Sequence, residues 1–354
     1  MNVLIKTSLG FDGVSSITMN YCRMLKKECN YTFFVIGTKD DIRKDVYKEI
    51  ENNKWNIIYA PDSVKHFFEY RKLLRKTIKN GEFDLFHING NSSLMYIDYH
   101  IAKSVNKKLK IITHSHNSNC THRKLHFLLK PLFNAAKVTR ISCSDAAGNW
   151  AYGRKKYLVI PNVIDYSKFY FNENYRLELG NKYNLYKKKV LLHIGAFVKA
   201  KNQEYLAKVF KLFFLHNPNS VAIFIGEGDE KERVISVFKE MNILDKVLFL
   251  NNQSDIYKYY SLADVFLMPS IYEGLPVVLI EAQVAGLPCI ISNNISKQTI
   301  ITENVVSLDI DEKNVECWCN QIEKLINNNS RNFIGKDDFS AEVKAKELLN
   351  IYCN

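Results

Sequence analysis

The amino-acid sequence predicts an α/β protein with two domains, each built on a parallel β-sheet. The chain has 354 residues, more than a single hydrophobic core usually holds. Short β-branched and aromatic runs alternate with segments of helical periodicity, which is typical of βαβ units. The alternation stops once, in a polar, lysine-rich stretch after residue 164, and then restarts. With 47% hydrophobic and 24% charged residues, the composition excludes a disordered or fibrous chain.

The first series of strands predicts a Rossmann-like domain over residues 1–168. Its strands, most of them separated by helices, are expected at residues 3–6, 31–36, 57–59, 85–88, 111–114, 140–143 and 157–160. Pro161 and Asn162 follow the last strand, and the polar stretch after them is expected to be the linker.

The second series predicts another Rossmann-like domain over residues 169–335. Its strands are expected at residues 190–194, 222–225, 247–250, 265–268 and 289–292. Residues 336–354 contain a helical pattern that we expect to pack back on the first domain. Two such domains with sheets facing across a cleft would bind ligands beyond the carboxyl ends of their strands.

The charge of the chain favours anionic partners. Lys and Arg number 49 against 37 Asp and Glu, a formal net charge of +12, which suits acidic lipid headgroups or phosphorylated small molecules. No nucleic-acid-binding motif accompanies the charge, so no nucleic-acid partner is expected. No apolar run reaches the roughly 18 residues of a membrane span, which favours a cytoplasmic protein.

The segment SIYEGLPVVLIEAQVAGLPCII, residues 270–291, has the richest chemistry. A tight turn at Gly274 followed by Pro276 at the first helical position predicts a helix that starts at the carboxyl edge of the sheet. Such a helix start binds phosphate through free backbone N–H groups, here those of Gly274, Leu275, Val277 and Val278. Glu273 and Glu281 could reach different parts of one ligand. An amphipathic helix with a capping acid is the alternative.

This segment resembles the E-x7-E motif of family 4 retaining glycosyltransferases, through Glu273 and Glu281. Four further motifs fall in the order and spacing of that family, closest to its capsule and exopolysaccharide branch. They are IITHSHN (111–117), VIPNVID (159–165), HIGAFVKAKNQ (193–203) and IGEGD (225–229). The resemblance implies the GT-B fold.

The resemblance also implies roles on the donor side. Glu281 would bind the ribose of a nucleotide sugar, and Glu273 would lie beside the transferred sugar. Lys201, after the strand that leads to Gly195, would neutralise the diphosphate of the leaving nucleotide. The family usually has arginine where this chain has Ala196, and a methyl group cannot replace a guanidinium.

Two more glycines, Gly226 and Gly228, follow the strand that ends at residue 225 and are expected to let backbone approach the donor closely. A third glycine of the dinucleotide fingerprint is missing, and no phosphate-loop motif occurs. Both absences argue against an NAD enzyme and a phosphate-loop nucleotidase.

On the acceptor or phosphate side, the segment His114-Ser115-His116-Asn117 ends the fifth strand. The resemblance makes His116 the active-site member, with Asn117 beside it. His114 is either a second ligand-binding histidine or a core residue. Gly10 and Gly13 correspond to the family's glycine-rich first turn, although the same loop is also an ordinary strand-to-helix turn.

Residues 65–79 (KHFFEYRKLLRKTIK) and 122–133 (HRKLHFLLKPLF) combine basic and aromatic residues. Each is either a helix that lies on a membrane surface or an ordinary helix packed on the sheet. The family's acceptors are often polyprenyl-linked, so peripheral contact with the inner face of the membrane would fit.

The expected function is retaining transfer of a hexosyl group from a nucleotide diphosphate sugar to a carbohydrate or lipid-linked acceptor in cell-surface polysaccharide biosynthesis. No cofactor or metal is expected, because Lys201 and a helix start supply the positive charge and no matching acidic cluster occurs. A nucleotide-sugar 2-epimerase and a non-catalytic nucleotide-sugar or glycan-binding scaffold are the alternatives.

Overall fold

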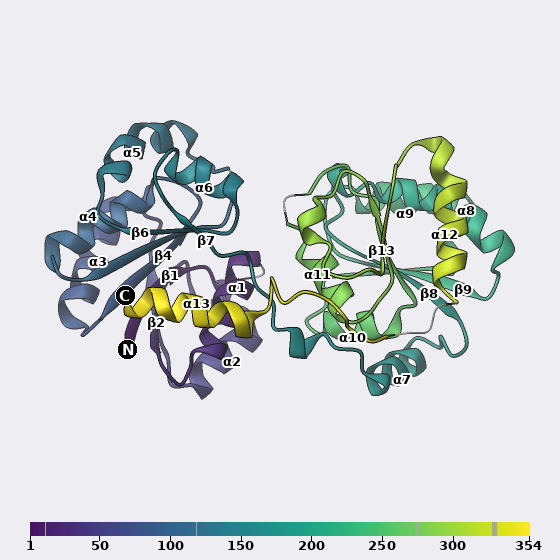
Figure 1. Ribbon diagram of the computed structural model, residues 1–354, viewed down its shortest axis with the longest axis horizontal. Helices are drawn as coiled ribbons and strands as arrows, with labels where there is room; N and C mark the ends of the chain where they lie inside the picture. The colour runs from purple at the N-terminus through teal and green to yellow at the C-terminus, as the bar shows by residue number, and fades with distance from the viewer. Residues whose placement is uncertain (11, 118, 274, 328–330) are drawn as a thin grey trace. The chain divides into compact units, whose positions relative to one another are not determined.

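The structure is a computed structural model that describes residues 1–10, 12–117, 119–273, 275–327 and 331–354. It contains two compact units (Figure 1). The first comprises Met1–Ile164 and Phe339–Asn354, and the second comprises Asp165–Asp338. The expected domain boundaries, after residues 168 and 335, lie four and three residues from these divisions.

The first unit is built on a sheet of seven parallel strands in the order β3-β2-β1-β4-β5-β6-β7. Its strands are β1 (Asn2–Thr7), β2 (Asn30–Ile36), β3 (Asn56–Ala60), β4 (Leu85–Gly90), β5 (Lys110–Ser115), β6 (Thr139–Ser142) and β7 (Leu158–Val159). The connections leave β1 toward β2 and leave β4 toward β5, so the order reverses between β1 and β4.

Helices cover both faces of this sheet (Figure 1). One face packs against α3 (Phe67–Asn80), α4 (Met95–Val105), α5 (Arg123–Ala135) and α6 (Asp145–Tyr152). The other packs against α1 (Gly13–Met24), α2 (Lys44–Asn52) and α13 (Ala341–Cys353). The strands are apolar on both faces, as a sheet covered twice requires.

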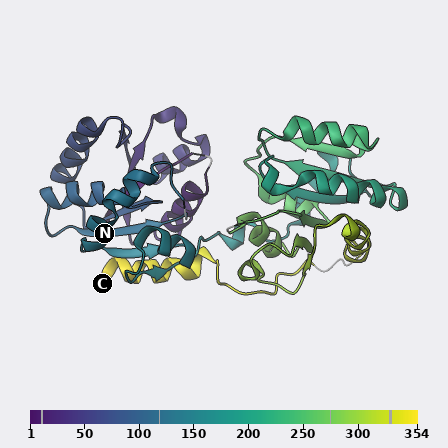
Figure 2. The same cartoon turned by 90° about the horizontal axis from the view of Figure 1, so that it is seen from above.

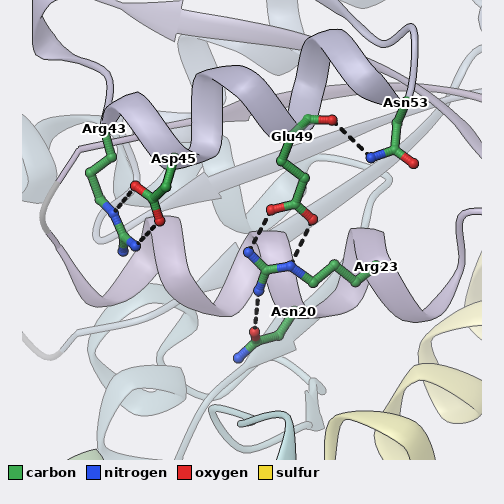
Figure 3. A network of polar contacts seen from close by, with 6 residues as sticks. All are labelled: Asn20, Arg23, Arg43, Asp45, Glu49 and Asn53. Carbon is green, nitrogen blue, oxygen red and sulfur yellow. Dashed lines mark hydrogen bonds and ion pairs between the residues drawn. The ribbon is translucent and has the colours of Figure 1, made fainter. Parts of the chain in front are cut away.

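An ion pair joins α1 to α2 (Figure 3). The guanidinium of Arg23 donates to both carboxylate oxygens of Glu49, each at 2.7 Å, and to the side-chain oxygen of Asn20 at 2.8 Å. Asn20 in turn donates to the backbone oxygen of Val163 at 3.0 Å. This network therefore holds the segment through which the chain leaves the first unit.

The C-terminal helix α13 belongs to the first unit (Figures 1 and 2). It buries Ala341, Ala345, Leu348 and Tyr352 in the core that α1 and α2 also share. The Tyr352 hydroxyl hydrogen-bonds His87 Nδ1 at 2.6 Å, and Lys110 donates to the last backbone carbonyls of the helix. Ile164 and Ser340 form a parallel bridge just before the helix.

The second unit contains a sheet of six parallel strands in the order β10-β9-β8-β11-β12-β13. The strands are β8 (Lys189–Ile194), β9 (Ser220–Ile225), β10 (Val247–Leu250), β11 (Val265–Met268), β12 (Cys289–Ser292) and β13 (Val305–Leu308). One face packs against α8 (Gln203–His216), α9 (Lys231–Glu240) and α12 (Val315–Leu325). On the other face lie α10 (Ile256–Leu262) and α11 (Val277–Val284), with α7 (Glu173–Lys182) against α10 (Figure 1).

All twelve strands expected from the sequence form, and the structure adds β13 at the edge of the second sheet. This four-residue strand, VVSL, is apolar at three positions but only partly buried, and it was not among the expected strands. The polar stretch expected to be a linker contains α7, which buries only Leu179 and therefore has almost no helical periodicity of hydrophobic residues. Among the described residues, no helix combines the length and apolar character needed to cross a bilayer.

Candidate active site

The adjacent central strands β8 and β11 of the second unit lead to two charged side chains. Connections leave these strands toward opposite edges of the sheet, and such a switch point is where open α/β sheets bind ligands. Lys201 ends the short turn Lys199–Lys201 after β8, and Glu273 lies in the loop after β11. Lys201 Nζ lies 2.5 Å from Glu273 Oε1, which also accepts a 2.7 Å hydrogen bond from Ser270 Oγ. Both charged side chains are less than a fifth exposed.

Two hydrogen bonds hold the two loops together. The backbone N–H of Ile271 donates to the carbonyl of Ala200 at 2.8 Å, and the side-chain amide of Asn202 donates from Nδ2 to the carbonyl of Pro269 at 3.3 Å. Asn202 has a left-handed backbone, with φ at 55°, a conformation that asparagine tolerates better than most residues. The Lys201–Glu273 pair is thus positioned by the fold itself.

Glu281 lies on α11 and is half-buried. Its Oε2 accepts a 2.7 Å hydrogen bond from the Tyr260 hydroxyl. Burial raises the pKa of Glu281 to about 7, while the bond from Tyr260 and the charge of Lys168 oppose the rise. This carboxylate can therefore accept a hydrogen bond more strongly as pH increases through neutrality.

The start of α11 lies where the phosphate-binding helix was expected, with one correction. The helix begins at Val277, and Pro276 is the residue before it with an extended backbone, so Pro276 is not the first helical residue. The N–H groups of Val277 and Val278 belong to the first turn, whose donors have no partner within the helix. Leu275 precedes them, and Gly274 lies outside the described residues.

A buried histidine lies beneath Gly195. His193 donates from Nδ1 to the carbonyl of Leu267 at 2.9 Å, and its Nε2 has no partner among the described residues. Burial lowers its pKa to about 4, so the ring is neutral and Nε2 is an acceptor. A Cβ at Gly195 would lie 3.4 Å from this nitrogen and 3.4 Å from the Lys201 stem. A side chain at position 195 would therefore pack tightly against both His193 and Lys201.

Gly226 and Gly228 adjoin the loop after β8. Their φ angles are +155° and +148°, and a Cβ would lie 2.1 Å from the Gly195 carbonyl oxygen or 2.4 Å from that of Phe197. Phe197 N–H donates to the carbonyl of Glu227 at 2.8 Å. These glycines therefore allow two loops of the protein to approach each other closely. From the sequence, the same glycines were expected to let the backbone approach a ligand.

In the first unit, His116 lies after β5 between two asparagines. Its Nε2 is 2.8 Å from Asn89 Oδ1 and its Nδ1 is 3.4 Å from Asn162 Oδ1. Burial lowers its pKa to about 4, opposed by Asn162 and by the charge of Asp12. The imidazole is therefore neutral near pH 7 and is held by uncharged groups.

His114 lies deeper than His116. It is 2% exposed, and its ring lies 4.1 Å from that of His116 and 5.5 Å from that of His87, between centroids. Burial lowers the pKa of His114 well below its ordinary value. The ring thus packs in the core of the first unit beside His116, and its Nε2 has no partner among the described residues.

The remaining residues expected near the acceptor lie at the starts of α1 and α5. Asp12 caps α1 by accepting from the N–H of Ser15 at 2.9 Å, and Gly13 is the first helical residue. A Cβ at Gly13 would contact nothing within 4 Å, whereas at Gly10 it would lie 3.1 Å from the Asp41 carbonyl oxygen. Asn117 is exposed on the segment that leads to α5.

Three residues of the second-unit site were not singled out from the sequence: His193, Tyr260 and Ser270. His193 carried a usable signal, because it is the one polar residue of the run VLLHI within a buried strand and a buried polar group is informative. Tyr260 carried none, since its partner Glu281 lies on another helix. Ser270 lies in the same loop as Glu273, three residues before it, but a loop serine does not stand out in a sequence.

Comparison with known proteins identifies the chain. Residues 177–338, all within the second unit, match the family model described as glycosyl transferases group 1. The second unit therefore matches this family along almost its whole length, and the chain is a glycosyltransferase. The resemblance to family 4 enzymes that was inferred from five motifs is thereby confirmed.

Relatives of this glycosyltransferase extend the match to the first unit. It is 26% identical over 310 residues to the Escherichia coli UDP-Gal:alpha-D-GlcNAc-diphosphoundecaprenol alpha-1,3-galactosyltransferase, covering 79% of each chain. It is 24% identical over 359 residues to the capsular polysaccharide biosynthesis glycosyltransferase CapH of Staphylococcus aureus, covering 96% of this chain and 95% of CapH.

Solved structures establish the fold of the enzyme. The crystal structure of Anabaena Alr3699/HepE in complex with UDP and glucose superimposes with a TM-score of 0.77 at 14% identity, over 100% of this chain and 99% of that chain. The expected GT-B fold is therefore confirmed. The family model and the relatives' names confirm the expectation that the chain is a glycosyltransferase.

Proposed function

We propose that this glycosyltransferase moves a hexosyl group from a nucleotide diphosphate sugar to a carbohydrate or lipid-linked acceptor, with retention of the anomeric configuration. The observation that carries the proposal is the Lys201–Glu273 ion pair at the switch point of the second sheet. Because open α/β sheets bind ligands there, a cation at this position can meet a diphosphate and a carboxylate can meet its sugar.

On the donor side, charge complementarity supports the assignment. Glu281, fixed by Tyr260, would accept hydrogen bonds from the ribose hydroxyls, and the first turn of α11 would donate to phosphate oxygens. Lys201 pairs with Glu273, and a bound diphosphate would share that cation. We propose that this positive charge makes a divalent metal unnecessary.

The bond changes follow from these roles. The bond between the anomeric carbon and the diphosphate oxygen breaks as the acceptor oxygen bonds to the same face of that carbon. The acceptor proton passes to the leaving phosphate, and Lys201 stabilises the negative charge that develops there.

On the acceptor side, His116 would bind a sugar hydroxyl. Its pKa of about 4 keeps the imidazole neutral, so it can accept a hydrogen bond from an uncharged partner. The single N–H of the neutral ring donates from Nε2 to Asn89 Oδ1, which leaves Nδ1, beside Asn162, as the acceptor. Asn117, Gly10 and Gly13 would complete this side. His114 would act by packing beneath His116.

The relatives' names support an acceptor in cell-surface polysaccharide biosynthesis, since one is a capsular enzyme and another is named for a diphosphoundecaprenol substrate. We place the acceptor at the inner face of the membrane and the enzyme in the cytoplasm against it. A nucleotide-sugar 2-epimerase and a binding scaffold are disfavoured, because these relatives are named as transferases.

The test is to incubate the enzyme with UDP- and GDP-sugars, with and without lipid-linked glycan acceptors. We expect nucleotide release that depends on the acceptor and a product whose anomeric configuration, measured by NMR, equals that of the donor. Activity should survive excess EDTA. Inversion, epimerised donor, or activity that returns only with added magnesium would each contradict the corresponding part of the proposal.

A further inference from the structure

Helix α5 exposes large apolar side chains on the side that faces away from the sheet. Phe127 is 55% exposed, Leu128 is 71% exposed and Leu132 is 51% exposed, whereas His126 and Phe133 are buried. Lys124, Leu128 and Leu132 are spaced four residues apart, so they form one stripe along the helix. The stripe combines a cation with two exposed leucines.

The start of α3 carries a similar feature. Phe67 and Phe68 are exposed, the latter by 81%, and their rings pack edge to face at 5.6 Å. Arg71 and Lys72 are also exposed and lie on the same side as Phe68 by helical spacing. Beyond this point the helix buries Tyr70, Leu74, Thr77 and Ile78 against the sheet.

Helices α3 and α5 lie on the same face of the sheet, with α4 packed against both. The pKa of Asp62, in the loop before α3, is lowered first by a hydrogen bond from the backbone of Lys65 and, among smaller causes, by the charge of His122. His122 immediately precedes α5. The exposed apolar residues therefore belong to one region of the first unit.

We call this region the α3–α5 surface. Its apolar members are Phe67, Phe68, Phe127, Leu128 and Leu132, and its exposed cations are Lys65, Arg71, Lys72, Arg123 and Lys124. The nearby acids are Asp62 and Glu69, so positive charge predominates. A soluble domain normally keeps such a cluster of large apolar side chains out of water.

We propose that the α3–α5 surface docks on an anionic lipid bilayer. Aromatic and leucine side chains would enter the boundary between headgroups and acyl chains, and the surrounding lysines and arginines would bind lipid phosphates. The charge complementarity selects a bilayer over an uncharged protein groove. Asn117, on the proposed acceptor side, lies on the segment that leads into α5, so docking would bring a lipid-linked acceptor near His116. Only this last consequence rests on the proposed function.

The experiment is sedimentation of the full chain with vesicles of phosphatidylcholine alone, or of equal parts phosphatidylcholine and phosphatidylglycerol. We expect binding to the mixed vesicles that weakens by about tenfold or more in high salt, since salt screens the attraction. The variant Phe68→Ser/Phe127→Ser/Leu128→Ser should lose binding to both vesicle types, and Arg71→Glu/Lys124→Glu should lose its preference for anionic lipid.

Leu215→Ser is the matched control, because Leu215 is 72% exposed on α8 of the second unit and its loss should leave vesicle binding unchanged. Calorimetry with UDP and GDP should give the parent's affinities in every variant. Equal binding of parent and surface variants, or no preference for anionic vesicles, would overturn the proposal. Self-association of the parent that the surface variants abolish, without vesicle binding, would assign the region to a second copy instead. Vesicle binding by a protein that transfers no sugar would leave docking intact and contradict only the proposed function.

Discussion

The two units carry candidate sites of opposite electrostatic character. In the first, His116 is held by Asn89 and Asn162 and is neutral, and His114 and His87 beneath it are neutral as well. In the second, the site contains the Lys201–Glu273 ion pair and the half-buried Glu281. The same fold thus presents neutral hydrogen-bonding groups in one unit and charged side chains in the other, which is the difference that the proposed acceptor and donor roles require.

The largest expected difference between the units is their response to acid. Burial lowers the pKa of His87 to about 3 and that of His116 to about 4, so unfolding takes up protons below about pH 6.5. Stability of the first unit is therefore full above that pH and falls as pH decreases. Between pH 7 and 5 we expect a loss of about 2 kcal/mol from each histidine.

The second unit should respond much less over the same range. His193 contributes a similar loss, but the pKa of Glu281 is raised to about 7. Ionising Glu281 in the folded state costs free energy, so its contribution to the free energy of unfolding increases as pH falls toward 4.5. This gain roughly offsets the loss from His193. Urea unfolding of variants that retain only Trp55 or only Trp318 would report on each unit. Equal acid sensitivity of the two would contradict this comparison.

Removing the cation of the second-unit site should have the next largest effect. Lys201→Ala is expected to lower turnover by about 10²- to 10³-fold, because a charge aimed at the leaving diphosphate is lost. Steady-state kinetics checks this, with Lys211→Ala, an exposed lysine on α8, as the control. Because Glu273 loses its ion-pair partner in this variant, thermal melts are needed to establish that the variant is folded. A folded variant with parental turnover would remove Lys201 from the mechanism.

Glu281→Gln should weaken UDP or GDP binding by about tenfold to a hundredfold, because a charge-assisted hydrogen bond to ribose is worth about 1.5–3 kcal/mol. The parent's affinity should rise with pH through 7 as Glu281 ionises, and that of the variant should not. Calorimetry at several pH values measures both, with the exposed Glu240→Gln as control. The same affinity and pH profile in variant and parent would place the ribose elsewhere.

His116→Ala tests the opposite half of the comparison. Transfer should fall by about threefold to tenfold, since one neutral hydrogen bond is worth about 0.5–1.5 kcal/mol, while nucleotide affinity stays unchanged. His100→Ala, an exposed histidine on α4, should leave both quantities unaltered. Loss of nucleotide affinity in His116→Ala would mean that the first unit also binds the donor.

The smallest effect is expected from Ala196→Arg, which would add a guanidinium to the loop after β8. Ala196 is exposed, so the longer side chain can be accommodated, and a few-fold gain in donor affinity or turnover should follow from bidentate phosphate binding. If nothing improves, Lys199→Ala should be measured, because a loss there would show that Lys199 already supplies this charge.

Much of the fold was predictable because its signals are local. Apolar runs such as VLLHI and VFLM form central strands whatever surrounds them, and motif spacing identified the family. Elements with few buried residues were not predictable in this way. The edge strand β13 and the helix α7 depend on neighbours that are distant in sequence.

The sequence by itself determined that this chain is a two-domain glycosyltransferase, and which loops carry its charged residues. Only the tertiary structure decided what those residues contact. Two histidines two positions apart differ in role because β5 directs His114 into the core while His116 lies beyond the strand end. Likewise, Gly226 and Gly228 lie against the carbonyls of Gly195 and Phe197, and Glu281 meets Tyr260. Such contacts join separate elements of the chain, so their distances and the resulting pKa values exist only once the sheet has assembled.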